Sequence, residues 1–302
     1  MNQEALLERD SLGAQVVHRG RRLLAKTARF ARHKPLGFIG MMICLTAIFV
    51  SVFATPIGRY DPNFGGDYVD AFQGPSLAHW FGTDESGRDV FSRLAHGTGV
   101  SLQIAFYAIG IASVSGFLLG IVSGYFGGWV DMLLQRITDS LLAFPGILLA
   151  LTLVAVLGGG LASVAVAIGI AFAPSPLRII RGTVLSVREN AYIDASRVIG
   201  ASSARIMFRH VLPNVTAPFL IIASVALGAA ILIEAALSYL GLGVPPPYPS
   251  WGRSLSGSAS DYAIIAPWLV VFPGLCISIL VLGFNMFGDA LRDIWDPRLR
   301  GR

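Results

Sequence analysis

The chain has 302 residues, of which 54% are hydrophobic and only 14% are charged. Because soluble domains carry about 25% charged residues, the 23 Lys and Arg and the 18 Asp and Glu are too few to cover a soluble protein of this length. The composition therefore excludes a soluble enzyme, a disordered chain and a secreted disulfide scaffold, and it indicates an integral membrane protein.

The charged residues are clustered, and the charge-free stretches between the clusters predict the helices that cross the membrane. A crossing needs about 20 apolar residues, so each of the shorter stretches is expected to hold one helix. The stretch 140–177 is interrupted by Gly158-Gly159-Gly160, which predicts two helices joined by a tight turn. We predict an all-α polytopic fold with six spans, at about residues 36–55, 100–124, 139–157, 161–177, 215–240 and 264–287.

The distribution of Lys and Arg predicts which segments face the cytoplasm. With the N-terminus inside, 19 of the 23 basic residues fall in cytoplasmic segments, so both termini are expected in the cytoplasm. The basic leader and the apolar run after it are too long for a signal peptide. The predicted organisation is a basic N-terminal segment 1–35, a first helix 36–55, an extracytoplasmic segment 56–99, a five-helix core 100–287 with a cytoplasmic loop 178–213, and a cytoplasmic tail 288–302.

The sequence lacks the common motifs of enzymes and of metal sites. Its five histidines show no metal-ligand spacing, and its only lysines, Lys26 and Lys34, lie in the basic leader and not in a phosphate-binding loop. We therefore expect no catalytic residues, no metal and no cofactor in this chain. If the protein carries out a process that consumes energy, this energy has to be supplied from outside the chain.

The loop 178–213 is far longer than a connection between two helices needs to be. Its apolar positions predict two short amphipathic helices, and Gly200 between them supplies the backbone angles of a sharp corner. Pro213 lies near the first turn of the fifth span, where a missing N–H is tolerated. The expected apolar face must bury against lipid, the protein's own helices or a partner. It comprises Ala195, Val198, Ile199, Ile206, Met207 and Val211.

The second half of this loop carries a recognisable motif. Asp194-Ala195-Ser196, then Gly200, then His210-Val211-Leu212-Pro213 resembles the loop of ABC importer permeases in which E-A-A, G and I-x-L-P recur at the same spacing. Three letters differ, because Asp194 stands for Glu, Ser196 for Ala and His210 for Ile. The spacing nevertheless matches at every anchor of the motif.

Three further stretches resemble the dipeptide, oligopeptide and nickel branch of that family. The run 82–93 resembles its segment after the first span, and the run 240–252 resembles its loop between the fifth and sixth spans. The run 284–297 resembles its C-terminal end. Together the motifs cover about residues 30–300 and point to the second permease subunit, the "C" subunit, with the fold of type I importer permeases.

The resemblance implies the partners and the source of energy. Such a chain pairs with a homologous second permease, with two ATPase subunits or domains that bind ATP and Mg²⁺, and with an extracytoplasmic substrate-binding protein. It lies among the lipids of the bacterial cytoplasmic (inner) membrane and has no nucleic-acid partner. The implied substrate is a di- or oligopeptide, with nickel, glutathione-like peptides and opines as alternatives. The residues implied in coupling to the ATPase are Asp194, Ala195, Ser196, Gly200, His210, Leu212 and Pro213.

The segment 82–94 has two interpretations. As a short interfacial helix it would place Asp89 and Arg93 four residues apart in an ion pair, which favours a purely structural role. Alternatively, its charged side chains contact the extracytoplasmic binding protein. The residues that would make these contacts are Asp84, Arg88, Asp89 and Arg93.

Two features lie inside predicted spans. Glu234 is a carboxylate deep in the fifth span, where such groups usually face a cavity or a partner. It is therefore either part of the translocation path or a hydrogen-bonded packing residue. Gly116, Gly120 and Gly124 are spaced four residues apart on the second span, which predicts close contact with another helix.

Two functions of other classes remain as alternatives. A secondary transporter driven by an ion gradient would show internal repeats and an ion site near the membrane centre, where Glu234 is the one acid. A membrane enzyme acting on lipid-linked substrates would gather polar catalytic residues at one interface, whereas the five histidines are scattered along the chain.

Overall fold

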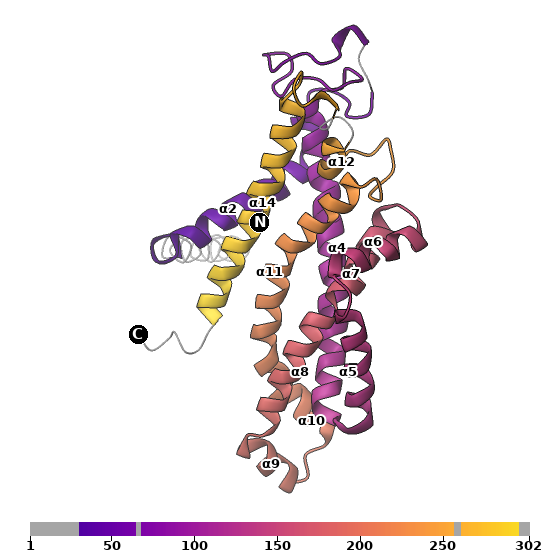
Figure 1. The fold of residues 1–302 in the computed structure, drawn as a ribbon. Helices are drawn as coiled ribbons and strands as arrows, with labels where there is room; N and C mark the ends of the chain where they lie inside the picture. Colours follow the sequence, from indigo (N-terminus) through magenta and orange to yellow (C-terminus); the bar gives the residue numbers. More distant parts are fainter. Residues whose placement is uncertain (1–29, 65–67, 257–260, 296–302) are drawn as a thin grey trace, which may run out of the picture.

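The computed structural model describes residues 30–64, 68–256 and 261–295, and Figure 1 shows this part of the chain as an elongated bundle of helices. Four helices are each long and apolar enough to cross a membrane. They are α2 (Pro35–Val52), α4 (Val90–Phe126), α11 (Leu212–Tyr239) and α14 (Trp268–Trp295). The shorter elements are α3 (Ala54–Ile57), η1 (Tyr68–Asp70), α5 (Gly128–Leu142), α6 (Gly146–Leu157), α7 (Leu161–Phe172), α8 (Pro174–Arg188), α9 (Ala191–Val198), α10 (Ser203–Ile206), the π-helical turn η2 (Met207–Val211) and α12 (Trp251–Leu255).

Two further helix pairs reach the composition of a span only when each bent pair is taken as one crossing. α5 and α6 meet at 92° around Pro145, and α7 and α8 meet at 40° beside Pro174. Proline has no backbone N–H, and its ring clashes with the preceding turn, so a straight helix does not continue through these positions. The six predicted spans thus correspond to four continuous helices and two bent pairs.

The predicted boundaries of the third and fourth spans are wrong in detail. The third was expected as one helix over 139–157, but α5 starts at Gly128 and the chain bends before α6. The fourth was expected to end near residue 177, but α8 continues to Arg188 and takes up the first part of the predicted loop 178–213. Of the predicted terminal segments, residues 1–29 and 296–302 lie outside the described residues.

α4 is longer at its start than the sequence predicted, beginning at Val90 and not near residue 100. The side chain of Asp89 caps the helix by accepting a hydrogen bond from the backbone N–H of Ser92 at 2.8 Å, which is the usual role of Asp at this position. The short interfacial helix expected over 82–94 is therefore not a separate element. Residues 82–89 form a turn, closed by a bridge between Thr83 and Asp89, and the helix that follows is α4 itself.

The glycine ladder of α4 packs directly on α8, as predicted. A Cβ atom on Gly120 would lie 2.8 Å from the carbonyl oxygen of Leu177, and one on Gly124 would lie 2.8 Å from Cβ of Val184. Gly116 is as close to Pro176. Because no side chain separates the two backbones, α4 and α8 form a stiff pair that runs along the bundle (Figure 1).

α2 and α14 lie side by side along one flank of the bundle (Figure 1). Gly40 and Gly283 allow this contact, since a Cβ on Gly40 would lie 2.6 Å from the carbonyl oxygen of Gly283. At the ends of the two helices, Lys34 Nζ and Asp293 Oδ2 form an ion pair at 2.5 Å. The start of α2 and the end of α14 are therefore held together.

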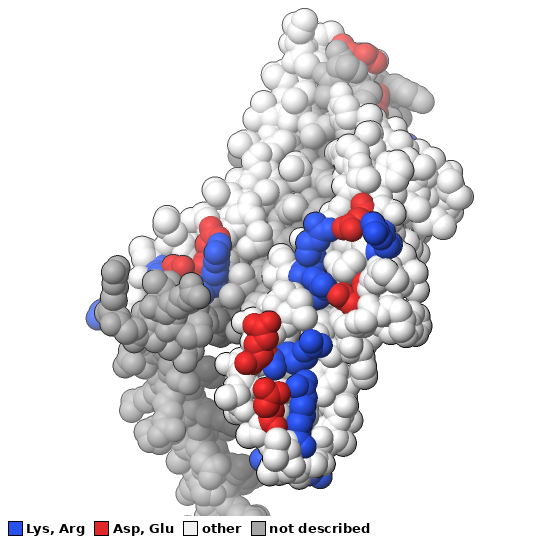
Figure 2. Space-filling view, turned by 60° about the horizontal axis from the view of Figure 1, so that its bottom comes forward, with Lys and Arg blue, Asp and Glu red and all other residues white. Residues whose placement is uncertain are grey.

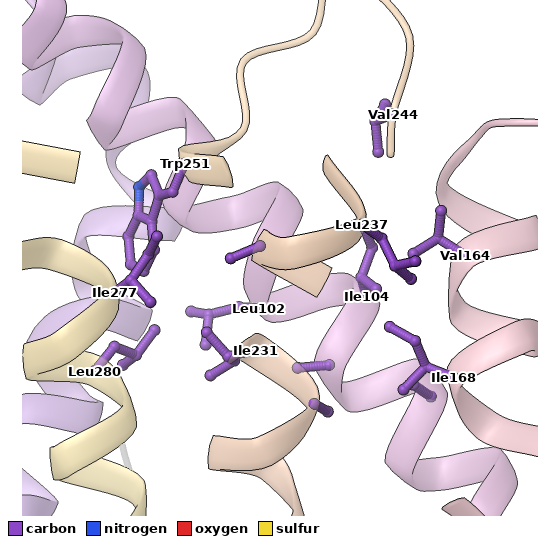
Figure 3. Packing of buried hydrophobic residues seen from close by; sticks show 14 of the residues in the cluster. Leu102, Ile104, Val164, Ile168, Ile231, Leu237, Val244, Trp251, Ile277 and Leu280 are labelled. Carbon is purple, nitrogen blue, oxygen red and sulfur yellow. The ribbon is translucent and has the colours of Figure 1, made fainter. Parts of the chain in front are cut away.

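Two clusters of buried apolar residues stabilise the fold. The larger one joins α4, α7, α11 and α14, and Figure 3 shows Leu237 and Ile104 meeting Val164 and Ile168, with Trp251 and Leu280 farther along. The second cluster lies where α4, α8 and α11 approach the α9–α10 turn, and it comprises Ile121, Tyr125, Ile180, Val184, Val187, Ile193, Ile206, Val211 and Val215. The α9–α10 turn is thus packed onto α4, α8 and α11 by its own core.

Candidate functional site

Residues 190–213, here called the hairpin, form a compact corner at one end of the bundle (Figure 1). α9 ends at Val198, Gly200 takes φ of +80°, and α10 with η2 leads back into α11. Two backbone hydrogen bonds close the corner, from Gly200 N–H to Arg197 O at 2.9 Å and from Ala201 N–H to Ser196 O at 3.0 Å. Because positive φ strains residues that carry a Cβ, the corner requires glycine, as the sequence predicted.

The hairpin is fixed to the bundle by a few buried side chains. Ile193 of α9 is 0% exposed, and Ile206 and Val211 on the returning arm are also buried. All three belong to the second cluster, together with residues of α4, α8 and α11. The hairpin is therefore joined to these helices by close-packed side chains.

The hairpin exposes apolar side chains at its corner and on its returning arm. Val198 is 87% exposed, Ile199 is 84% exposed and Phe208 is 70% exposed. Of the predicted apolar face, Ile206 and Val211 pack on the protein's own helices, whereas Val198 and Ile199 are left for lipid or a partner. The buried positions of the first arm are Ile193 and Ser196. The helical phase explains the difference, because residues 193 and 196 lie three apart on the side that faces the bundle.

The motif residues separate into buried and exposed groups. Ser196 is buried, and its hydroxyl donates to Tyr192 O at 2.7 Å and lies 3.5 Å from Nε2 of His210 across the corner. Asp194 is 66% exposed in its side chain and pairs only with Arg197 of its own helix, at 2.9 Å. Ala195 and Pro213 are exposed, whereas Leu212 and His210 are half-buried.

Ion pairs tie α5 to α8 near the hairpin. Both oxygens of Asp131 accept hydrogen bonds from Arg181, at 2.5 and 2.6 Å, and Asp139 pairs with Arg178. Arg188 donates to the carbonyl oxygen of Tyr125 at 3.0 Å, at the end of α4. Figure 2 shows acidic and basic side chains gathered next to one another on this face. Sequence reasoning missed these partners, because they are far apart in the chain.

A cavity of about 760 Å³ lies between α4, the α7–α8 pair and α11, and Arg292 of α14 is part of its wall. Its lining is mostly apolar, with Ser113, Ser175 and Asn214 as further polar residues. Pockets of this size, with few polar groups, are typical of sites for small molecules. The sequence did not bring these residues together, since they come from five separate helices.

Glu234 lies deep in the bundle and is 0% exposed. One carboxylate oxygen accepts a hydrogen bond from the hydroxyl of Ser101 in α4 at 2.8 Å, and the other accepts one from Ser238 in α11, also at 2.8 Å. Of the two interpretations of the sequence, this geometry favours the hydrogen-bonded packing residue. Ser101 is the partner that sequence reasoning missed.

The residues 82–93, here called the Asp84 loop, lie at the other end of the bundle from the hairpin (Figure 1). One oxygen of Asp84 accepts from the backbone N–H groups of Ser86 and Arg88, each at 2.9 Å, and the other accepts from Arg88 Nε at 2.7 Å. Its side chain is only 8% exposed. The carboxylate therefore holds the loop in shape.

The expected ion pair between Asp89 and Arg93 does not form. Asp89 caps α4 and contacts His79 Nδ1 at 2.9 Å, so its oxygens are already engaged. Arg93 instead donates to the carbonyl oxygen of Pro62 at 2.7 Å and lies 3.6 Å from Asp84. The prediction failed because it treated 82–94 as one helix, whereas Asp89 precedes α4.

Comparison with known proteins identifies the family. The model of the family "Binding-protein-dependent transport system inner membrane component" matches residues 116–301. The dipeptide transport system permease protein DppC of Alkalihalophilus pseudofirmus is 44% identical over 88% of this chain and 86% of its own. The glutathione transport system permease protein GsiD of Pectobacterium atrosepticum is 41% identical over 90% of each chain.

A solved structure shows the same fold. It is the MetNI methionine ABC transporter in inward-facing conformations, with a TM-score of 0.50 and 17% identity, and the match covers 66% of this chain and 96% of that one. The motifs around Gly200 and in the Asp84 loop had pointed in the same direction. The chain belongs to the family of inner-membrane permeases of binding-protein-dependent transport systems.

Proposed function

We propose that this permease subunit imports short peptides and receives the energy of ATP through the hairpin, whose tip docks on a partner ATPase. The observation that carries the proposal is the exposure of Val198, Ile199 and Phe208 on a hairpin that is anchored in the second cluster. The anchoring side chains are Ile193, Ile206 and Val211. A short helix that presents apolar side chains is a common mode of docking into a groove. ATP and Mg²⁺ would be bound by the ATPase subunits, because this sequence has no phosphate-binding loop.

The proposed coupling is mechanical. Closure of two ATPases would bring the hairpins of two permease chains together, and the second cluster would pass this movement to α4, α8 and α11. The glycine contacts between α4 and α8 and the ion pair of Asp131 with Arg181 keep that end of the bundle stiff. The spans would then alternate between inward-open and outward-open states, with a homologous second permease completing the path.

The proposed orientation places the hairpin and both termini in the cytoplasm of a bacterial cell, and the Asp84 loop outside. The excess of Lys and Arg in the predicted cytoplasmic segments supports it. The ion pair of Lys34 with Asp293 is consistent with it, because this contact keeps the start of α2 and the end of α14 on one side. A binding protein would then deliver substrate on the side of the Asp84 loop.

The cavity of about 760 Å³ is the proposed contribution of this chain to the path. Its apolar walls suit the side chains of a short peptide, while Asn214 and Arg292 offer donors for a peptide carbonyl and a terminal carboxylate. Glu234 is left out of this proposal, since both of its oxygens are engaged inside the bundle. DppC and GsiD, the relatives described above, are named as dipeptide and glutathione permeases.

Glutathione is the second candidate substrate. The observation in its favour is that GsiD is nearly as similar to this chain as DppC, at 41% against 44% identity. Glutathione is itself a short peptide that carries additional charge. Both candidates therefore fit an apolar cavity with an arginine in its wall.

The test of the docking site changes Val198 and Ile199 to Ser in one variant of the complete importer. Burial of one such side chain contributes roughly 1.5–3 kcal/mol, so the amount of ATPase that co-purifies should fall at least about tenfold. Val69→Ser is the matched control, because Val69 is 88% exposed near the Asp84 loop and should change nothing. Undiminished ATPase in the double variant would contradict the proposal.

The test of the substrate uses the same importer in proteoliposomes with its binding protein. ATP-dependent uptake of labelled di-alanine and of labelled glutathione is measured separately, each with the other compound or nickel as competitor. The proposal expects uptake of the dipeptide. Uptake of glutathione without uptake of di-alanine would select the second candidate, and uptake that needs an ion gradient and no ATP would overturn the importer mechanism.

A further inference from the structure

A second, smaller pocket lies at the end of the bundle that carries the Asp84 loop. Its volume is about 240 Å³, and its walls come from the Asp84 loop, from residues 246–256 and from the first half of α14. It shares no lining residue with the cavity of about 760 Å³. The two sites are therefore separate, and the smaller one belongs to the face at which substrate would arrive.

Three guanidinium groups line this pocket, those of Arg88, Arg93 and Arg253. Arg88 and Arg253 are close enough to Arg93 for their positive charges to repel it. The acids in the lining are Asp84 and Glu85, so the formal charge of the pocket is +1. A small concave site with an excess of cations attracts an anion.

The carboxylate of Asp84 is already committed to the loop. Its two oxygens accept from two backbone N–H groups and from Arg88, and Arg93 approaches it at 3.6 Å. Glu85 contacts Arg88 at 3.3 Å and is partly exposed. These acids offset Arg88 and Arg93 and leave the charge of Arg253 as the excess.

Arg253 is the residue with donors to spare. Its Nη1 donates to the carbonyl oxygen of Val244 at 3.2 Å, and within residues 30–64, 68–256 and 261–295 no carboxylate forms an ion pair with it. An arginine has five N–H donors arranged in a planar fork that matches a carboxylate. The contact with Val244 fixes the side chain and, among the residues that the structure describes, leaves most of this fork without a hydrogen-bond partner.

The rim of the pocket suits a protein partner. Tyr248 is 57% exposed, and it lines the pocket together with Pro246 and Pro247. Arginine and tyrosine are the residues most enriched where binding energy is concentrated in protein interfaces, and a surrounding apolar rim excludes water from such contacts. The pocket thus combines a cationic base with an apolar edge.

We propose that this pocket receives an Asp or Glu side chain of the extracytoplasmic binding protein, and that Arg253 is the residue that binds its carboxylate. The inference rests on the proposed function, since it needs a binding protein that docks on this face. Of the candidate contacts drawn from the sequence, Arg88 and Arg93 line the pocket, whereas Asp84 helps to build it and Asp89 caps α4. The partner supplies the carboxylate.

The experiment measures the affinity of the purified binding protein for the complete importer in nanodiscs, at low and high salt. Arg253→Gln should weaken binding about tenfold or more and should reduce its dependence on salt. Arg253→Lys keeps the charge and should lose less. Arg59→Gln is the matched control, because Arg59 is an exposed arginine on the same face that contacts Leu77 and Trp80 outside the pocket.

A charge exchange identifies the partner group. Arg253→Glu should abolish binding, and changing the exposed acids of the binding protein to Lys one at a time should restore it at one position. The amount of co-purified ATPase reports folding, since the ATPase site lies at the other end of the bundle. A variant that loses both the ATPase and the binding protein is misfolded. In that case the affinity of Arg253→Lys for the binding protein tests the proposal.

Two outcomes would overturn the proposal, and a third would refute the proposed function on which it rests. Equal affinities for wild type, Arg253→Gln and Arg59→Gln would overturn it. Unchanged affinity with reduced uptake of di-alanine, but not of its C-terminal amide, would also overturn it by assigning the pocket to the substrate's own carboxylate. A wild-type importer that binds no binding protein would instead refute the proposed function.

Discussion

The Asp84 loop and the hairpin are both charged segments that the sequence marked as surfaces for partners, yet they are built in opposite ways. In the Asp84 loop, Asp84 and Asp89 are buried and engaged by neighbouring groups of the same chain. In the hairpin, Asp194 is exposed and the apolar residues Val198 and Ile199 face outward. One segment satisfies its own polar groups, while the other leaves apolar surface uncovered.

The difference shows which side chains of a motif are available to a partner. Breaking the contacts of a buried carboxylate with several hydrogen bonds costs free energy of folding. Such a residue therefore has a structural role even when it lies in a recognisable motif. An exposed apolar residue on a rigid base costs nothing to the fold and gains free energy when a partner covers it. The two segments therefore predict opposite results for stability and for association.

The largest effect on stability is expected from Asp84→Asn. Asn removes the charge that Arg88 and Arg93 contact, and breaking a buried ion pair costs about 3 kcal/mol, so the midpoint of thermal unfolding in detergent should drop clearly. Asp194→Asn is the matched control in the hairpin, where one exposed contact with Arg197 should contribute under about 0.5 kcal/mol. Equal unfolding temperatures of the two variants would contradict the structural role assigned to the buried carboxylate of Asp84.

A smaller effect is expected where α4 contacts α8. In Gly120→Ala the new methyl group would lie 2.8 Å from the carbonyl oxygen of Leu177, and such overpacking costs about 1–3 kcal/mol. Gly110→Ala is the control on the same helix, because nothing lies within 4 Å of its Cβ position. The unfolding midpoint should fall for Gly120→Ala alone.

The same two variants also distinguish a loss of stability from a loss of mechanical coupling between ATP hydrolysis and peptide uptake. If α4 and α8 carry movement from the hairpin, Gly120→Ala should lower peptide uptake more than it lowers ATP hydrolysis. Equal stability of both variants would show that α8 can shift away from α4 at no cost. The stiff contact inferred from the glycine ladder would then be absent.

The sequence predicted the parts of the fold that depend on local composition. Charge-free stretches predicted the positions of α2 and α11 closely, and the spacing of Gly116, Gly120 and Gly124 correctly predicted a close helix contact. The predicted end of the sixth span at residue 287 was wrong, because α14 continues to Trp295. The bend at Pro145 was missed as a division of the third span. It was missed because hydropathy does not change across a proline, while the backbone direction does.

The candidate sites were harder to predict, because their contacts join distant residues. The pairing of Ser101 with Glu234 and of Asp131 with Arg181 links helices far apart in the chain. The sequence left the position of Val198 open, since the pattern of an apolar residue on a short helix is the same whether the side chain packs inward or contacts a partner. Only the packing of Ile193 into the second cluster fixes which side of α9 faces the bundle.

The smallest effect on stability is expected from Gly200→Ala, which should nevertheless reduce the coupling of ATP hydrolysis to uptake. Gly200 has φ of +80° and open space around its Cβ position, so the cost is only that of a strained backbone, about 1–2 kcal/mol. The strain should be relieved by opening the corner, which moves Val198 and Ile199 relative to Phe208.

Gly182→Ala is the control, because Gly182 lies in α8 without positive φ and with nothing within 4 Å of its Cβ position. ATP-dependent uptake should fall severalfold in Gly200→Ala while the protein remains folded. Normal uptake would mean that the hairpin tolerates a different corner and that docking depends on the apolar tip alone.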